Sequence, residues 1–95
     1  MIDLQNIFLL DEEFERLNSY YQEHNRHEIR QRAHMIILRT KSYTPSYIAD
    51  ILNRGDYYVI VYVKAWYYFK EDGLFDDDFE GLIEKIEKLE NYKYD

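Results

Sequence analysis

The stretch TPSYIADILNRGDYYVIVYVKAWYYF, residues 44–69, decides the fold of this chain. Thr44 is a suitable N-cap, and Pro45 suits the first helical position, where the N–H that proline lacks would be unpaired anyway. The apolar residues that follow lie on one helical face, which predicts a short amphipathic helix over about 45–52. The sequence NRGD at 53–56 is typical of a turn, and its aspartate can cap the next helix.

Residues 57–69 are ambiguous between two kinds of secondary structure. The first seven, YYVIVYV, combine aromatic and β-branched side chains and have a high strand propensity. Tyr58, Tyr62 and Trp66, however, recur at helical spacing. A helix explains the whole segment, whereas a strand explains only its first half, so we expect a helix that ends at Gly73.

Three more helices are expected outside this stretch. Apolar spacing predicts a helix over about 12–24, with Asp11 as its N-cap and acids in its first turn. The segment 27–41 is apolar around much of its girth, which predicts a central helix. The acidic run at 76–78 precedes an amphipathic helix over about 78–91.

The length indicates one domain spanning residues 1–95, and the expected elements make it an all-α domain of five helices. Of the residues, 46% are hydrophobic and 33% charged, as in a globular protein. The absence of cysteine excludes disulfides, thiol nucleophiles and cysteine-based zinc sites. No apolar run approaches the ~20 residues that cross a bilayer, and the first residues do not resemble a signal peptide. We therefore expect an intracellular, cytoplasmic protein with no membrane contact.

The charge is distributed unevenly along the chain, whose formal net charge is −7. Counting Lys, Arg, Asp and Glu, residues 1–25 carry −5, residues 26–70 carry +5 and residues 71–95 carry −7. A basic middle thus lies between two acidic ends. Such asymmetry bears on the choice of partner more than the total does.

A short helix opened by Thr-Pro, a turn and a second helix form the layout of a helix-turn-helix, here at about 45–71. The runs IRQRAHMIILRTKSYTPSYIADILN (29–53) and WYYFKEDGLFDD (66–77) resemble the N-terminal DNA-binding region of mariner-like bacterial insertion-sequence transposases. The matching positions are Arg30, Arg32, Ala33, Ile37, Leu38, Tyr43, Thr44, Ile48, Ala49, Leu52, Phe69, Gly73 and Leu74. The resemblance implies a homeodomain-like domain that binds double-stranded DNA. The family's catalytic domain does not fit in 95 residues, so we expect DNA binding without catalysis.

The DNA-binding hypothesis assigns roles to ten residues. Four bases would follow the phosphate backbone, two hydroxyls would donate to a phosphate at a helix start, and four residues would face the major groove. In that order they are Arg30, Arg32, Arg39 and Lys41; Thr44 and Ser46; and Arg54, Tyr57, Val61 and Lys64.

The competing hypothesis is a protein-interaction or dimerisation module that does not bind DNA. The helix over 57–69 has apolar groups on two opposite faces; the C-terminal helix can cover one and a second copy the other, which predicts a homodimer. The acidic ends would then attract a basic partner. DNA binding requires the bases at 30, 32, 39, 41, 54 and 64 to share one surface, whereas the interaction hypothesis expects them to scatter or to pair with the acidic ends.

No motif indicates an enzyme. The chain has no glycine-rich phosphate loop and no nucleophile with a base at a diagnostic spacing. His24 and His27 lie near Glu28, but at an expected break between helices, so they do not predict a metal site. The aspartates at 76–78 are interpreted as a cap and turn, because catalytic carboxylates converge from different strands. We expect no catalytic residue, metal, cofactor or small-molecule substrate.

Overall fold

The computed structural model describes residues 9–92, which contain six helices and no strand. The helices are α1 (Asp11–Glu23), α2 (His27–Thr40), α3 (Pro45–Leu52), α4 (Asp56–Phe69), α5 (Glu71–Leu74) and α6 (Phe79–Tyr92). The prediction of an all-α fold is confirmed, and the ambiguous segment is helical throughout. Six helices replace the expected five because α5, of four residues, follows α4. No helix within residues 9–92 has both the length and the apolar character needed to span a membrane.

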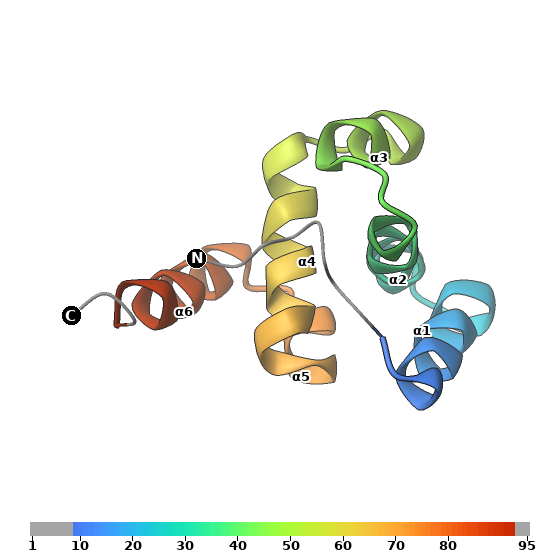
Figure 1. Ribbon diagram of the computed structural model, residues 1–95, viewed down its shortest axis with the longest axis horizontal. Helices are drawn as coiled ribbons and strands as arrows, with labels where there is room; N and C mark the ends of the chain where they lie inside the picture. Colours follow the sequence, from blue (N-terminus) through green and yellow to red (C-terminus); the bar gives the residue numbers. More distant parts are fainter. Residues whose placement is uncertain (1–8, 93–95) are drawn as a thin grey trace.

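Helix α4 is the centre of the fold (Figure 1). It packs against α2 and α3, α5 folds against its end, and α6 lies on its other side, while α1 packs on α2. The sequence predicts a second copy of the chain on one apolar face of this helix. The structure places α2 and α3 there instead, so the burial of α4 requires no second copy. A helix that is apolar all round is buried on both sides, as here.

Two predicted helix starts are confirmed in atomic detail. Thr44 caps α3, since its hydroxyl oxygen accepts a hydrogen bond from the Tyr47 N–H at 3.1 Å, and Pro45 is the first helical residue. At the start of α6, an Asp78 carboxylate oxygen accepts from the Gly81 N–H at 3.1 Å. Each side chain satisfies a backbone donor that has no partner within its own helix.

Two other predicted N-caps are displaced by one residue. Asp11 and Asp56 are the first residues of α1 and α4, and Leu10 and Gly55 precede them as caps. In α1 the Glu13 carboxylate makes the capping hydrogen bond, because it accepts from the Leu10 N–H at 3.0 Å. Both aspartates still lie in a first turn, where the helix dipole favours negative charge.

The prediction that Gly73 ends the long helix is wrong. Helix α4 ends at Phe69, where Lys70 takes φ 54° and ψ −130°, a strained combination for a residue with a side chain. Gly73 lies inside α5 at a negative φ, and it is needed for space. A Cβ at this position would lie 2.7 Å from the Ala65 carbonyl carbon and 2.9 Å from the Ala65 Cβ. The glycine therefore allows α5 to pack directly on α4.

Candidate functional site

Three of the ten predicted DNA-binding residues are buried. Arg32, Arg39 and Val61 expose only 4%, 5% and 3% of their surface. Val61 faces α6, and an Arg39 Nη donates to the Tyr43 carbonyl oxygen at 2.7 Å. These positions correct the assignment, because a buried side chain in this conformation cannot contact a phosphate or a base edge.

Arg32 joins three parts of the fold from a buried position. It donates hydrogen bonds to the Tyr58 hydroxyl at 3.1 Å, to the Leu74 carbonyl oxygen at 3.1 Å and to the Asp77 carboxylate at 3.0 Å. Its guanidinium carbon also lies 4.2 Å from the centre of the Tyr62 ring. The residue thereby ties α2 to α4 and to the segment that leads into α6.

Other predicted residues make hydrogen bonds within the chain. The Lys64 Nζ lies 3.0 Å from a Glu90 carboxylate oxygen, and the Ser46 hydroxyl donates to Asp56 at 2.6 Å. The Thr44 hydroxyl oxygen serves as the cap of α3. Lys64 is thus neutralised by the acidic C-terminal helix.

Two of the three remaining bases, Arg30 and Arg54, lie near each other, since Arg54 bonds to Gln31, the residue after Arg30. An Arg30 Nη donates to the His24 carbonyl oxygen at 2.6 Å, and the Arg54 Nε donates to the Gln31 side chain at 2.8 Å. Lys41 is exposed. With two of the six bases buried and a third paired with α6, the six do not all share one exposed surface, as the DNA-binding hypothesis requires.

Ion pairs connect the basic middle of the chain to both acidic ends. Asp77 lies 2.8 Å from Arg26 and 3.0 Å from Arg32, and Lys70 lies 3.1 Å from Glu13. This pairing is what the protein-interaction hypothesis expects. It also leaves many carboxylates of α1 and α6 facing solvent.

These pairs make stability depend on pH. Hydrogen bonds from Arg26 and Arg32 lower the pKa of Asp77, and the hydrogen bond from the Leu10 N–H lowers the pKa of Glu13. Unfolded carboxyl groups bind protons at about pH 3.9 to 4.3, above the values in the folded protein. The unfolded state therefore takes up more protons as the pH falls, and folding loses stability.

We expect the urea midpoint to fall modestly between pH 8 and about pH 5, because burial lowers the pKa of His34 and the unfolded state binds that proton first, and then to fall further toward pH 3 as the carboxylates take up protons. The fluorescence of Trp66, the single tryptophan, reports the transition because its side chain is buried. Glu13→Gln should flatten the second part of the fall, since the variant lacks that carboxyl group. A midpoint that is unchanged between pH 5 and pH 3 would contradict the prediction.

A groove of about 180 Å³ lies between α4 and α6. In each helix its lining residues follow the spacing i, i+3, i+4, i+7, which places them on one helical face. The lining residues are Tyr57, Ile60, Val61 and Lys64 of α4, and Ile83, Ile86, Glu87 and Glu90 of α6. Three predicted DNA-contacting residues thus line a groove that α6 closes on one side.

The groove has an apolar floor and a polar rim. Val61 and Ile86 are buried in the floor, and Ile60 and Ile83 are half-buried beside them. Tyr57 at the rim exposes 54% of its surface. Since Val61 and Ile86 are already almost fully buried, the groove exposes more polar than apolar surface, and its apolar part comes from the half-buried isoleucines.

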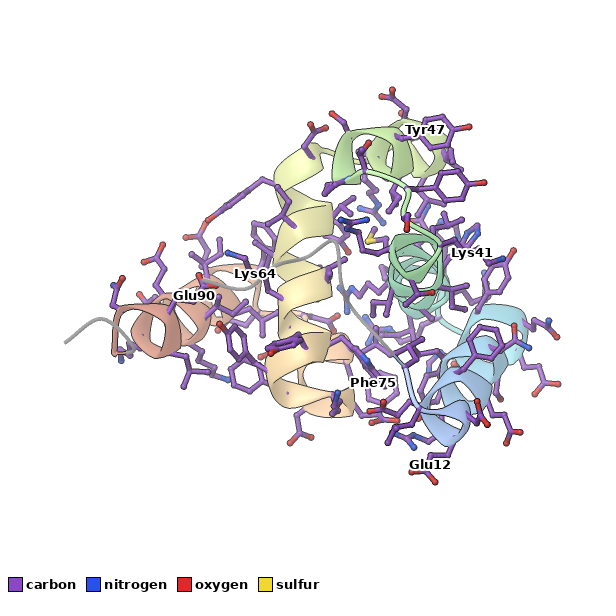
Figure 2. All side chains as sticks on the ribbon, in the orientation of Figure 1. Glu12, Lys41, Tyr47, Lys64, Phe75 and Glu90 are labelled. Carbon is purple, nitrogen blue, oxygen red and sulfur yellow. The ribbon has the colours of Figure 1, made fainter. Side chains whose placement is uncertain are left out.

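Both ends of α6 are held against α4, which forms the groove in advance of any ligand. At the start of α6, the Phe79 ring stacks on Tyr58 with centroids 5.7 Å apart. Near its end, Glu90 binds Lys64, and its second oxygen accepts from the Tyr68 hydroxyl at 3.3 Å (Figure 2). The sequence predicts the apolar stripe of α6, but it does not indicate which helix that stripe meets.

Comparisons of the chain with protein-family models, with curated proteins and with solved structures find no match in any of the three. Within residues 9–92, no group of three or more histidine, aspartate or glutamate side chains is arranged to hold a metal ion. What the groove can bind is therefore argued from its lining residues and their charges.

Proposed function

We propose that this protein is a protein-interaction module that binds a basic amphipathic helix of another protein in the groove between α4 and α6. The observation that carries the proposal is the pair of helix faces, each with the spacing i, i+3, i+4, i+7, around an open groove with isoleucines on both walls. Helix-in-groove recognition uses apolar anchors at this same spacing on the bound helix. A third helix would complete the packing that α4 and α6 begin.

The size and chemistry of the groove suit such an anchor. A volume of about 180 Å³ accommodates one large apolar side chain above Val61 and Ile86. Exposed aromatic residues are enriched in protein interfaces, and Tyr57 stands at the rim. Burying one large apolar side chain contributes about 1.5 to 3 kcal/mol to the association.

The charge around the groove favours a basic partner. Glu87 lies at the rim, and Glu80 and Glu84 are exposed on the same helix. The whole chain carries a formal net charge of −7. Complementary charge speeds association and rejects partners of the same sign, while the apolar anchor supplies affinity.

The proposal is tested by titrating the isotope-labelled full chain with a synthetic 15-residue helical peptide of leucine and lysine. We expect saturable shifts of the backbone amide signals of Ile60 and Ile83. A peptide with glutamate in place of lysine should bind far more weakly. Ile83→Asp should reduce affinity about tenfold, whereas Ile51→Asp, on the exposed part of α3, should not.

A second pair of variants separates local charge from net charge. Glu87→Lys and Glu12→Lys change the net charge equally, but Glu12 lies on α1, far from the groove and from Glu90 (Figure 2). We expect Glu87→Lys to weaken binding about fivefold and Glu12→Lys by less than twofold. Equal effects would mean that the peptide responds to net charge alone, and the proposed site would be wrong.

Duplex DNA binding by a transposase-like, homeodomain-like helix-turn-helix is the second candidate. It is favoured by the three-residue turn between α3 and α4, which matches that layout, and by the exposed Lys41. Because α6 covers Val61, this candidate requires α6 to move away from α4. An anisotropy titration with random duplex at about 50 mM salt distinguishes the two. Binding whose logarithm falls with log salt at a slope of about −4 would support DNA, whereas peptide binding without DNA binding would support the groove.

A further inference from the structure

A second hollow lies where α1, α2 and the end of α3 meet, and its charge is opposite to that of the groove. Three basic side chains line it and no carboxylate does, although the chain as a whole is acidic. The lining residues are Tyr21 of α1, His27, Arg30, Gln31 and His34 of α2, and Leu52 of α3.

The α2 residues of the hollow follow the spacing i, i+3, i+4, i+7 and so project from one face of the helix. One Arg30 Nη donates to the His24 carbonyl oxygen at 2.6 Å, which fixes the guanidinium. A guanidinium has five N–H donors, so others are available to a ligand. The His34 ring stacks on Tyr21, with centroids 4.3 Å apart and an interplanar angle of 24°.

Gln31 holds the floor of this hollow and is not free for a ligand. Its amide nitrogen donates to the Leu52 carbonyl oxygen at 3.2 Å, and its amide oxygen accepts from the Arg54 Nε at 2.8 Å. These bonds tie α2 to α3 and to the following turn. The basic side chains are therefore held on a rigid base, which lowers the entropic cost of binding.

We propose that this hollow binds the phosphate group of a small phosphate monoester. Guanidinium and imidazolium donors form charge-assisted hydrogen bonds to phosphate oxygens, and arginine matches phosphate geometry with paired donors. The Tyr21 ring and the Leu52 side chain give apolar walls for the organic part of the monoester. The proposal does not depend on the groove between α4 and α6.

Phosphate binding is coupled to protonation of His34. Burial and the positive charge of Lys41 lower the pKa of His34, so the free protein holds this imidazole largely neutral at pH 7. A bound dianion favours the imidazolium and raises that pKa. The groups around His34 are Tyr21 on α1, His27 and Arg30 on α2, Lys41 directly after α2, and the uncharged Leu52 on α3. Affinity for phenyl phosphate should therefore rise as the pH falls from 8 to 7, a range in which a phosphate monoester, with a second pKa of about 6, stays dianionic.

The three histidines make this testable by proton NMR on the full chain, with inorganic phosphate and phenyl phosphate as probes. We expect saturating phosphate to raise the pKa of His34 by about 1. His24 is the comparison, because its ring lies against Phe75, outside the hollow, and its signal should move less than that of His34 although its carbonyl binds Arg30. Phenyl phosphate should bind several-fold more tightly than inorganic phosphate, since Tyr21 and Leu52 contact its ring.

Matched variants complete the test. Arg30→Gln should weaken binding about tenfold or more, as expected for the loss of a hydrogen bond from a charged donor. Lys85→Gln removes an exposed base elsewhere and should have less than a twofold effect. His27→Gln, at an exposed position, provides a second measurement if Arg30→Gln fails to fold. Shifts that affect all three histidines alike without saturation would indicate an adventitious ion only and would overturn the proposal, as would equal effects of Arg30→Gln and Lys85→Gln.

Discussion

Replacement of Arg32 with alanine is expected to lower the free energy of unfolding by about 2 to 4 kcal/mol, because two acceptors lose a buried donor and each such loss costs about 1 to 3 kcal/mol. The change leaves the Leu74 carbonyl oxygen and the Tyr58 hydroxyl without this donor. It also opens a void beside the Tyr62 ring and removes a buried partner of Asp77. An arginine that the sequence assigns to a phosphate contact is thus expected to act as a major stabilising residue of the core.

Urea unfolding followed by Trp66 fluorescence measures this effect. The matched control is Arg26→Ala, since Arg26 binds the same Asp77 carboxylate from an exposed position. We expect a much smaller change from the control, because exposed ion pairs contribute little. Equal stability of the two variants would show that the buried hydrogen bonds of Arg32 do not stabilise the fold more than the exposed ion pair of Arg26 does.

Gly73→Ala is expected to be the second strongly destabilising substitution, by about 2 to 3 kcal/mol. The added Cβ would lie within 3 Å of the Ala65 backbone and Cβ, and backbone atoms of α4 cannot yield as a flexible side chain can. Either α5 must move away from α4, or the contact must be strained. Displacement of α5 would also weaken the hydrogen bond from Arg32 to the Leu74 carbonyl oxygen.

Gly55→Ala is the matched control for this substitution. A Cβ at Gly55 has no neighbour within 4 Å, and its φ of −78° suits any residue. The change should stay within about 1 kcal/mol, since a modest loss at the N-cap is offset by a less flexible unfolded chain. Thermal unfolding followed by circular dichroism compares the two variants. A Gly73→Ala protein as stable as Gly55→Ala would contradict the close packing of α5 on α4.

The features predicted correctly from the sequence are those with local causes. Thr44 and Pro45 mark a helix start through backbone chemistry confined to a few residues. The helical form of Asp56–Phe69 follows from the spacing of its own apolar side chains, in spite of its β-branched residues. Such signals need no knowledge of what the helix touches.

The features that were missed depend on contacts between distant parts of the chain. Arginine is a residue type usually found at the surface. The partners of Arg32, Leu74 and Asp77, lie more than 40 residues further along the sequence. The sequence places Val61 at the surface because the helix periodicity does not indicate that α6 covers that side. Gly73 has the usual signature of a helix end, whereas its role is to provide space beside Ala65.

The two walls of the candidate groove can be predicted from the sequence, but their contact cannot. Each of its walls has a helical spacing that is visible in the sequence, at 57–64 and at 83–90. Only the fold brings the two walls together, because Phe79 and Glu90 hold α6 at its two ends. The sequence therefore indicated an interaction module as an alternative, without its position.

Helix α6 contacts the rest of the protein mainly through α4, so α6 can detach before the other helices unfold. An element attached through one neighbour can open as a cooperative unit at less cost than global unfolding. Such a partial opening would separate Lys64 from Glu90 and expose Val61, while the packing among α1 to α5 stayed intact. A partner helix in the groove would contact both walls and bind only the closed form, so partner binding and the docking of α6 would stabilise each other.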